Sequence, residues 1–540
     1  MRAVPPAPHP TFERTETLPA ALRAWAERDP DRPFLHEVGG TSRSYGQFHE
    51  DALRWADAFR RAGIQPGDNV PSIATTSIAA QEHWLALGWL RAVHIGVNTD
   101  FRGRSLAYVL GNCRARRMLC EKSFLSRVSE VADELDLLEL VIVVDADPEE
   151  LPTEFPVPLR SGTELWHSAR PATDLAVPER HEIACITYTS GTTGPSKGVL
   201  IPWGRLWPDE LWMTMTSDDV HYCPFPVFHL SGMAPLAWLG FPGGQVVLRE
   251  SFKTQAFWDD VRKYGCTVAA IIPVMMTWLL DQPARPDDLD NPLRSVAIGP
   301  VIPGVDEFKR RFGVQVRTKF GNTEVGTPLY AGPDVSADRA SNGLWVAPGY
   351  EVRLVDEHDY EVPTGQVGEL LVRTTEPWRM AVGYYGMPEK TAEAWRNGWF
   401  HTGDGVVRGE DGRYHFVDRI KDSMRRRGEN ISAAEVEAYV NEHPAVMESA
   451  AIGVPWERGE EEVKVCVVLV EGATLTPEEL HQFLAERMPA FMVPRYIEFV
   501  ADPERTEAMQ RIKKPPLRID PLNERTWDAQ RKQWARAGTH

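Results

Sequence analysis

The sequence predicts an α/β fold: a large N-terminal domain of mainly parallel sheets flanked by helices, a β-rich subdomain, and a small α+β C-terminal domain. Up to about residue 348, apolar residues at helical spacing alternate with short β-branched runs. Beyond that point strands alternate with turn signals, and the last hundred or so residues mix helical and strand patterns. A chain of 540 residues with 43% hydrophobic residues is long enough to bury more than one core.

The N-terminal part begins with amphipathic helices and continues with buried strands. Between Leu18 and Leu90 apolar residues recur at helical spacing, as at Leu22 and Trp25. Helix-length segments separate the strands, which favours a parallel sheet with helices on both faces. The predicted strands are 140–144, 183–188, 245–248, 268–272 and 295–298.

The C-terminal part has a different pattern. Ser432 and Glu435 have the spacing of a capping box and predict a helix through Val440, and Thr476 with Glu479 predicts a second helix. We expect the charged tail, 520–540, to be a surface helix or a frayed end. The predicted strands of the β-rich and C-terminal parts are 351–355, 368–373, 413–417 and 463–470.

Composition excludes several functional classes. The formal net charge of −18 opposes binding to nucleic acid or to an anionic membrane surface. Six scattered cysteines lack the spacing of a zinc site or disulfide scaffold, so we expect reduced, buried thiols in a cytoplasmic protein. Prolines and glycines interrupt 220–248, the longest span without charges, which argues against a membrane span. The Pro-rich, charged segment 1–16 predicts no secretion signal.

The strongest chemical signal is the segment 187–198, Thr-Tyr-Thr-Ser-Gly-Thr-Thr-Gly-Pro-Ser-Lys-Gly, directly after a predicted strand. Glycines let backbone N–H groups approach phosphate oxygens, hydroxyls add donors, and Lys197 supplies charge. The spacing differs from the Walker loop, in which Gly-Lys-Ser/Thr opens a helix. A flexible Gly/Thr surface loop is the alternative. The segment therefore predicts a polyphosphate site.

With this loop, further motifs make the chain resemble the adenylate-forming superfamily of acyl-CoA synthetases, aryl-CoA ligases, peptide-synthetase adenylation domains and luciferases. The motifs occur in the family's order between Leu18 and Arg518 and look most like those of bacterial acyl-CoA or carnitine-CoA ligases. They are Phe320-Gly321-Asn322-Thr323-Glu324, the segments 225–232 and 399–404, Asp418-Arg419-Ile420-Lys421-Asp422, and 428–432.

The resemblance implies a domain over 1–417 that binds ATP and an acid, a hinge at 418–421, and a mobile domain over 422–540. It implies that Phe320 stacks on adenine, that Thr323 meets a phosphate oxygen, and that Glu324 helps hold Mg²⁺, an ion that prefers oxygen ligands. Asp404 and Arg419 inherit contacts to the ribose. The implied ATP-binding residues are Thr189, Ser190, Gly191, Thr192, Thr193, Gly194, Lys197, Gly299, Phe320, Gly321, Asn322, Thr323, Asp404 and Arg419.

The same resemblance implies roles for the C-terminal motifs. Lys421 stands at the pivot, where a family hinge absorbs the rotation between two half-reactions. Gly428 and Glu429 match the loop that lines the thiol tunnel of CoA ligases. CoA is accordingly the implied co-substrate, and the resemblance also allows a homodimer.

One family motif is altered. The usual C-terminal catalytic lysine falls, by register, on Arg511. Arginine keeps the charge, but its planar fork is bulkier than an ammonium group. Lys513 or Lys514 takes the place if the register shifts. The implied catalytic residues are Arg511, Thr323, Glu324 and Lys197.

The altered motif leaves three functional hypotheses open. The first is an AMP-forming acid–CoA ligase for a small or aromatic acid. The second is adenylation of an unusual acid such as nitrite, with transfer to an amine, as in ATP-dependent diazotases. The third is an impaired, nucleotide-binding homologue. The expected acid pocket consists of Phe228, His229, Met233, Val274, Met275, Gly299, Pro300, Lys319 and Asn322.

Overall fold

A computed structural model gives two units, each described by itself. The first contains the described residues up to Thr189 together with Ser196–Glu351 and Arg373–Gly398, and the second contains Val352–Val372 and the described residues from Trp399 onward. The predicted hinge falls partly on residues 420–423, outside the described residues, so the boundaries 1–417, 418–421 and 422–540 stay predictions. The structure describes residues 12–13, 15–189, 196–208, 214–333, 335–337, 342–419, 424–426, 429–431, 433–456, 461–488, 492–505 and 511–534.

One sheet of the first unit has seven strands, in the order β7-β6-β5-β3-β4-β8-β9. All neighbours run parallel except β9, which pairs antiparallel with β8. The predicted strands 140–144 and 183–188 are confirmed as β6 and β8. The strands are β3 (Asn69–Ile73), β4 (Val93–Gly96), β5 (Arg117–Cys120), β6 (Leu140–Val143), β7 (Leu159–Ser161), β8 (Ile183–Thr189) and β9 (Lys197–Pro202).

The second sheet of this unit has nine strands, in the order β16-β15-β14-β13-β12-β10-β11-β1-β2. Its centre, from β14 to β1, is parallel, and its edge strands are antiparallel. The three remaining predicted strands of this part are confirmed as β11, β12 and β13. The strands are β1 (Pro33–Glu37), β2 (Ser42–Ser44), β10 (Val220–Cys223), β11 (Gln245–Leu248), β12 (Val268–Ile271), β13 (Ser295–Ile298), β14 (Gln315–Asn322), β15 (Gly326–Ala331) and β16 (Trp345–Val346).

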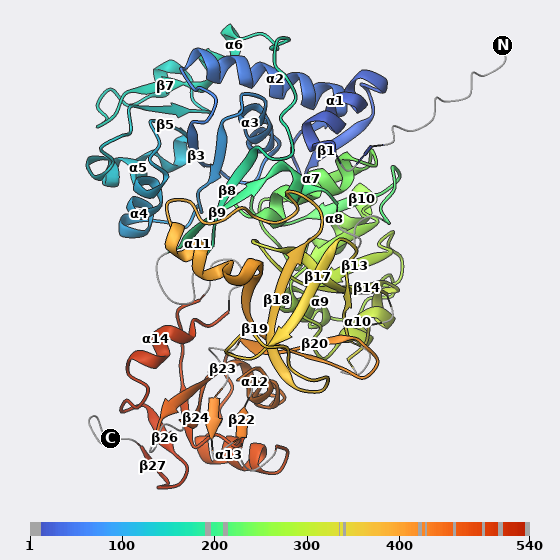
Figure 1. The fold of residues 1–540 in the computed structure, drawn as a ribbon, viewed down its shortest axis with the longest axis vertical. Helices are drawn as coiled ribbons and strands as arrows, with labels where there is room; N and C mark the ends of the chain where they lie inside the picture. Colours follow the sequence, from blue (N-terminus) through green and yellow to red (C-terminus); the bar gives the residue numbers. More distant parts are fainter. Residues whose placement is uncertain are drawn as a thin grey trace, which may run out of the picture. The chain divides into compact units, whose positions relative to one another are not determined.

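Helices cover both sheets, as the alternation of patterns predicts. Within the first unit α1, α2 and α3 contact one another, and α4 contacts α5 (Figure 1). A capping box at Ser44 and Gln47 satisfies backbone donors at the start of α2. The helices are α1 (Leu18–Arg28), α2 (Tyr45–Arg61), α3 (Ile78–Trp89), α4 (Gly103–Cys113), α5 (Leu125–Val131), α6 (Gly162–Ser168), α7 (Leu230–Gly240), α8 (Phe257–Tyr264), α9 (Pro273–Leu280), α10 (Val305–Phe312) and α11 (Pro388–Ala394).

Two histidines are buried in the core of the first unit. His83 on α3 lies edge-on to Trp55, with ring centroids 4.5 Å apart, and neither of its ring nitrogens has a hydrogen-bond partner among the described residues. His94 lies on β4. Burial lowers the pKa of each to about 3. Both are therefore neutral in the folded protein at pH values where the unfolded chain takes up protons.

We expect this unit to lose stability in mild acid. Because the folded pKa lies below the unfolded value of about 6.5, the unfolded state binds more protons, and the stabilisation is lost progressively as the pH falls from about 6.5 toward 3. Between about pH 7 and 5.5 the loss is roughly 1 kcal/mol per histidine. Urea unfolding of His83→Leu should show a weaker pH dependence than the wild type. An equal weakening of the pH dependence in His167→Asn, at an exposed position of the same unit, would show that burial of His83 is not the cause.

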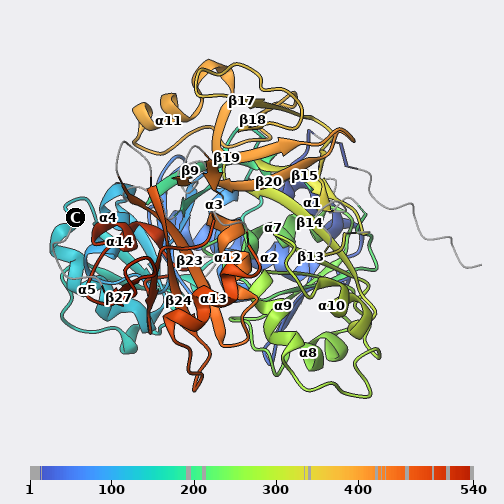
Figure 2. The same cartoon turned by 90° about the horizontal axis from the view of Figure 1, so that it is seen from below.

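The second unit contains a four-stranded sheet, β17-β18-β19-β20, and a five-stranded sheet, β23-β24-β25-β26-β27. Helices α12 and α13 contact each other, and α12 packs on β23 (Figure 2). The predicted capping box at Thr476 and Glu479 is confirmed. The elements are β17 (Tyr350–Val355), β18 (Val367–Thr374), β19 (Phe400–Arg408), β20 (Tyr414–Arg419), β21 (Met424–Arg426), β22 (Glu429–Ile431), α12 (Ala433–Asn441), β23 (Val446–Pro455), β24 (Glu461–Leu469), α13 (Pro477–Ala485), β25 (Tyr496–Phe499), α14 (Lys514–Ile519), β26 (Thr526–Asp528) and β27 (Gln533–Trp534).

The prediction for the charged tail, 520–540, is wrong. Residues 526–528 form β26, which pairs antiparallel with β25, and Trp527 is only 3% exposed. The segment was expected to be a surface helix or a frayed end because its charges dominate its composition. Its buried tryptophan and its pairing with β25 outweigh those charges.

Two expectations from composition concern cysteines and membranes. All six cysteines are free and buried, as expected, and burial raises the pKa of their thiols above the usual range. Among the described residues, none of the helices combines the length and the apolarity that a membrane span needs.

Candidate active site

The topology of the nine-stranded sheet brings the segments of the predicted acid pocket to one edge. Strands β10, β12, β13 and β14 are parallel neighbours, so their carboxyl ends lie along the same edge. The segments that leave this edge carry the predicted acid pocket. In open α/β sheets ligands bind outside the carboxyl ends of the strands. The pocket residues are Phe228, His229 and Met233 after β10, Val274 and Met275 after β12, Gly299 and Pro300 after β13, and Lys319 and Asn322 at the end of β14.

The segment after β10 is packed closely against the seven-stranded sheet. Gly96 ends β4, and a Cβ there would lie 2.6 Å from the Cα of Phe228, so only glycine allows this approach. The ring centroids of Phe228 and His229 are 4.7 Å apart. Burial lowers the pKa of His229 to about 4, and its Nε2 atom has no hydrogen-bond partner among the described residues. A neutral imidazole with an open nitrogen at this edge is suited to contact a polar ligand group.

The other pocket residues differ in exposure. Met233 and Met275 are buried, at 1% and 8% exposure, which suits an apolar floor. The ammonium of Lys319 lies 5.4 Å from the ring centroid of Trp238, within the range of a cation–π contact. Val274, Gly299 and Asn322 are partly exposed, and Pro300 is exposed.

The predicted phosphate loop joins β8 to β9. Ser190, Gly191, Thr192, Thr193 and Gly194 lie outside the described residues, but the two residues that flank the loop are paired, Thr189 opposite Lys197. Helix α4 supports this base. The Tyr108 hydroxyl donates to the Ser196 carbonyl at 3.0 Å, and the Tyr188 hydroxyl donates to Asn112 Oδ1 at 2.6 Å. The predicted position of the loop, directly after a strand, is confirmed.

The Phe320–Glu324 motif forms the tip of the β14–β15 hairpin. Asn322 Oδ1 accepts a hydrogen bond from the Val325 amide at 2.9 Å, which fixes the turn. Gly321 cannot be replaced without a shift, because a Cβ there would lie 1.9 Å from the Gly326 carbonyl oxygen. Glu324 is therefore placed at the tip of a turn held by both backbone and side-chain contacts.

A segment that sequence analysis missed, Ala381–Tyr385, connects the loop base with this hairpin. Val382 donates to the Leu200 carbonyl at 3.1 Å, and Ala381 donates to the Glu324 carbonyl at 2.8 Å. The Tyr384 hydroxyl donates to Glu324 Oε1 at 2.9 Å, and the Lys197 ammonium lies 4.7 Å from the centroid of the Tyr384 ring. A pair of adjacent tyrosines between two glycines, Gly383 and Gly386, is the sequence signal that could have drawn attention to it.

The described residues contain no group of three or more His, Cys, Asp or Glu side chains that could hold a metal ion. Mg²⁺ does not require such a cage, since it is commonly bound by one or two carboxylates together with substrate phosphates. Glu324, with one oxygen bonded to Tyr384, fits this mode. The residues present are thus compatible with a metal that arrives with the nucleotide.

Asp404 belongs to the second unit. It is 2% exposed, and its amide donates to Thr402 Oγ1 at 3.1 Å. In the register of β19 and β20 it lies opposite Arg419. The two ribose-binding candidates are therefore paired in one sheet. Lys421 and Gly428 lie outside the described residues, and Glu429 begins β22.

The predicted catalytic arginine also belongs to the second unit. Arg511 is exposed and precedes the buried Ile512. The Lys513 amide donates to the Glu504 carbonyl at 2.7 Å, and the Lys514 ammonium lies 2.8 Å from Glu437 Oε1. Lys514 is therefore engaged in an ion pair within its own unit.

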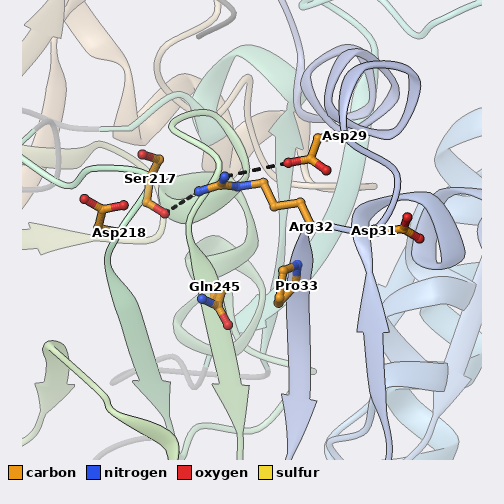
Figure 3. Close-up of a pocket in the computed structure, with 7 residues that line it drawn as sticks. All are labelled: Asp29, Asp31, Arg32, Pro33, Ser217, Asp218 and Gln245. Carbon is orange, nitrogen blue, oxygen red and sulfur yellow. Dashed lines mark hydrogen bonds and ion pairs between the residues drawn. The ribbon is translucent and has the colours of Figure 1, made fainter. Parts of the chain in front are cut away.

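A surface cavity of about 480 Å³ lies at the opposite edge of the nine-stranded sheet (Figure 3). Pro33 and Gln245, in its lining, are the first residues of β1 and β11. Arg32 donates to the Gly243 and Ser217 carbonyls, both at 2.6 Å. None of the predicted site residues lines this cavity, and its arginine serves to join segments of the fold. The candidate active site therefore lies at the carboxyl edge of the sheet and not at this cavity.

Comparison with known proteins identifies the family to which the chain belongs. The AMP-binding enzyme family matches residues 22–385, and the AMP-binding enzyme C-terminal domain matches 435–508. The chain is 32% identical over 484 residues to a crotonobetaine/carnitine–CoA ligase of Citrobacter koseri, covering 87% of this chain and 92% of that protein.

Two solved structures extend the likeness. A benzoate CoA ligase from Burkholderia xenovorans has a TM-score of 0.79 at 25% identity, covering 93% of this chain and 100% of that one. The anthranilate CoA ligase AuaEII, in complex with anthranoyl-AMP, has a TM-score of 0.80 at 22% identity, covering 94% and 97%, and shows likeness of fold.

These likenesses define an AMP-forming ligase of the acid–CoA class, whose co-substrates are ATP and CoA. The chain belongs to the AMP-binding enzyme family, since the family model covers well over half of it. The predicted α/β fold with a β-rich part and a C-terminal α+β part is confirmed.

Proposed function

We propose that the protein activates a small or aromatic carboxylic acid with Mg·ATP and transfers the acyl group to CoA. A carboxylate oxygen attacks the α-phosphorus and pyrophosphate leaves. The CoA thiolate then attacks the acyl carbon and AMP leaves. The observation that carries the proposal is the convergence of Lys197 and Glu324 on Tyr384, beside the strand ends that hold the acid pocket.

The chain's own residues supply charge and orientation in this reaction. Lys197 offers a cation to the phosphate oxygens, and Glu324 is the carboxylate that would hold Mg²⁺. The metal neutralises charge that develops on the phosphates. Fixed charges of this kind act on the transition state without reorganisation, and they are usually the largest contribution to such catalysis.

The charge of the acid pocket narrows the substrate class. The predicted pocket residues include Lys319 and His229 but no carboxylate, so none of them forms an ion pair with a cationic substrate, and the Lys319 ammonium repels one. A trimethylammonium acid of the carnitine type is therefore disfavoured, although the Citrobacter relative is named for carnitine. Phe228, Met233 and Met275 offer apolar surface to a ring. We propose benzoate-like acids as the substrate class.

The acceptor is proposed from the same relatives. The carnitine, anthranilate and benzoate relatives are all named as CoA ligases, and none of them supports the nitrite and amine alternative. The impaired-homologue alternative is also unsupported by these relatives, and the sequence keeps the Gly-rich loop, Glu324, Asp404 and Arg419. Gly428 and Glu429 remain the proposed tunnel residues, and Lys421 the proposed hinge.

A panel experiment tests this function. AMP release is measured with benzoate, anthranilate, short aliphatic acids and carnitine, each with and without CoA, beside nitrite plus an aromatic amine. Free thiol is followed in parallel, which is practical because all six protein cysteines are buried. Acid-dependent loss of CoA thiol, highest with benzoate-like acids, is expected. CoA-independent turnover of nitrite would contradict the proposal.

Arg511 yields a further prediction. Arg511→Ala should lower adenylate formation by roughly 10², because a cation that acts mainly on the transition state is lost. Thioester formation from preformed acyl-adenylate should be almost unchanged. Rapid-quench measurement of both half-reactions checks this, with Lys513→Ala and Lys514→Ala as matched controls. Loss of adenylation in Lys513→Ala instead would move the catalytic position by two residues.

A further inference from the structure

We propose that Tyr384 is a positioning residue that sets both Glu324 and Lys197 for Mg·ATP. The inference deepens the proposed function and rests on it. It concerns a side chain outside every motif recognised in the sequence. Its basis is that one phenol contacts the proposed metal-binding carboxylate with its hydroxyl and the proposed phosphate-binding lysine with its ring.

The hydroxyl acts on the carboxylate. It donates to Glu324 Oε1 at 2.9 Å. The phenol O–H is a donor and a carboxylate oxygen is an acceptor, so the direction of this hydrogen bond is fixed. With Oε1 held, the carboxylate has one fixed orientation and Oε2 remains for a cation. A hydrogen-bonded partner behind a metal ligand orients that ligand and tunes its affinity.

The ring acts on the lysine. The Lys197 ammonium lies 4.7 Å from the ring centroid, a distance at which the face of the ring attracts a cation. Lys197 is the first residue of β9, where the phosphate loop rejoins the sheet. The contact therefore keeps the ammonium near the loop base and near Glu324 without forming an ion pair that would neutralise both groups.

Tyr384 can position other groups because it is itself fixed. Its side chain is 6% exposed, and its amide donates to Thr391 Oγ1 at 2.9 Å. On either side of it, Gly383 accepts from the Leu200 amide at 3.0 Å and Tyr385 donates to the Gly198 carbonyl at 2.8 Å. The ring also meets Trp395 edge-on, with centroids 5.7 Å apart. A side chain held this way loses little entropy when it orders its neighbours.

Three variants separate the two contacts. Tyr384→Phe keeps the ring and removes the hydroxyl, and Tyr384→Leu removes both. Tyr385→Phe is the matched control, a neighbouring tyrosine on the same segment whose ring packs on the hydrophobic core of the seven-stranded sheet. Circular dichroism confirms that each variant is folded. The main readout is equilibrium binding of Mn²⁺, in place of Mg²⁺, followed by electron paramagnetic resonance in the presence of a non-hydrolysable ATP analogue.

Tyr384→Phe should weaken Mn²⁺ binding roughly tenfold or more, the usual effect of losing a partner behind a metal ligand. Tyr384→Leu should in addition weaken metal-free binding of the analogue by roughly two- to fivefold. Tyr385→Phe should change neither. Unchanged Mn²⁺ affinity in Tyr384→Phe, or an equal loss in Tyr385→Phe, would overturn the inference.

Different results would contradict the proposed function and the positioning role of Tyr384. A folded wild-type protein that releases no AMP with any acid of the panel contradicts the proposed function. If the wild-type protein releases AMP and pyrophosphate but Tyr384→Phe binds Mn²⁺ as tightly as the wild type does, only the positioning role of Tyr384 is contradicted.

Discussion

Replacing Glu324 with glutamine is expected to lower acid-dependent AMP formation by roughly 10³, the largest catalytic effect we foresee. Glutamine keeps the size of the side chain and can still accept the hydrogen bond from Tyr384, so the hairpin turn should be retained. What is lost is the negative charge that would hold Mg²⁺ beside the phosphates. Steady-state AMP release at varied Mg²⁺ measures the effect, and part of the activity should return at high Mg²⁺.

Glu393 provides the control for this substitution. It is an exposed carboxylate on α11, paired with Lys390 at 2.7 Å, in the same unit. Glu393→Gln should leave AMP formation within about twofold, since exposed ion pairs contribute little. Wild-type activity in Glu324→Gln would remove Glu324 from the proposed metal site.

Replacing Lys464 with methionine is expected to destabilise the second unit by about 3–5 kcal/mol. Lys464 is 1% exposed on β24, and its ammonium donates to Glu498 Oε2 at 2.5 Å, to the Pro521 carbonyl at 2.7 Å and to Thr526 Oγ1 at 3.2 Å. Without it Glu498 is a buried carboxylate that has lost its closest cation. Hydrogen exchange of the β24 amides should accelerate accordingly, because opening of this unit becomes easier.

Two further variants test the cause. Adding Glu498→Gln to Lys464→Met should recover part of the loss, because the buried negative charge is then removed as well. Arg413→Met removes the partner of the exposed Asp411, 2.6 Å away in the same unit as Lys464, and should change stability by less than about 0.5 kcal/mol. Equal effects of Lys464→Met and Arg413→Met would show that burial is not the cause.

The strands of the parallel sheets could be predicted because their signals are local. The runs 245–248 and 295–298 are short, β-branched and separated by helix-length segments, and they are β11 and β13 in the structure. The position of segments 225–232 and 320–324 at one sheet edge follows from parallel strand order, which fixes where carboxyl ends meet. The sequence pattern and the strand order therefore predict which segments lie at the candidate site.

The contacts that hold the site could not be predicted in the same way. Tyr384 reaches Lys197 and Glu324 only after three segments distant in sequence are folded together, and no periodicity reports such a contact. The tail was misjudged for a related reason. Trp527 is buried through pairing of β26 with β25, a non-local interaction that the charged composition of 520–540 conceals.

The central claim is that this site forms an acyl-adenylate. Exchange of labelled pyrophosphate into ATP, without CoA, tests it most directly, because exchange requires a reversible first half-reaction at the α-phosphorus. The account predicts exchange that depends on a benzoate-like acid and on Mg²⁺, and that is largely lost in Glu324→Gln. ADP and inorganic phosphate as the products, with no acid-dependent exchange, would contradict it.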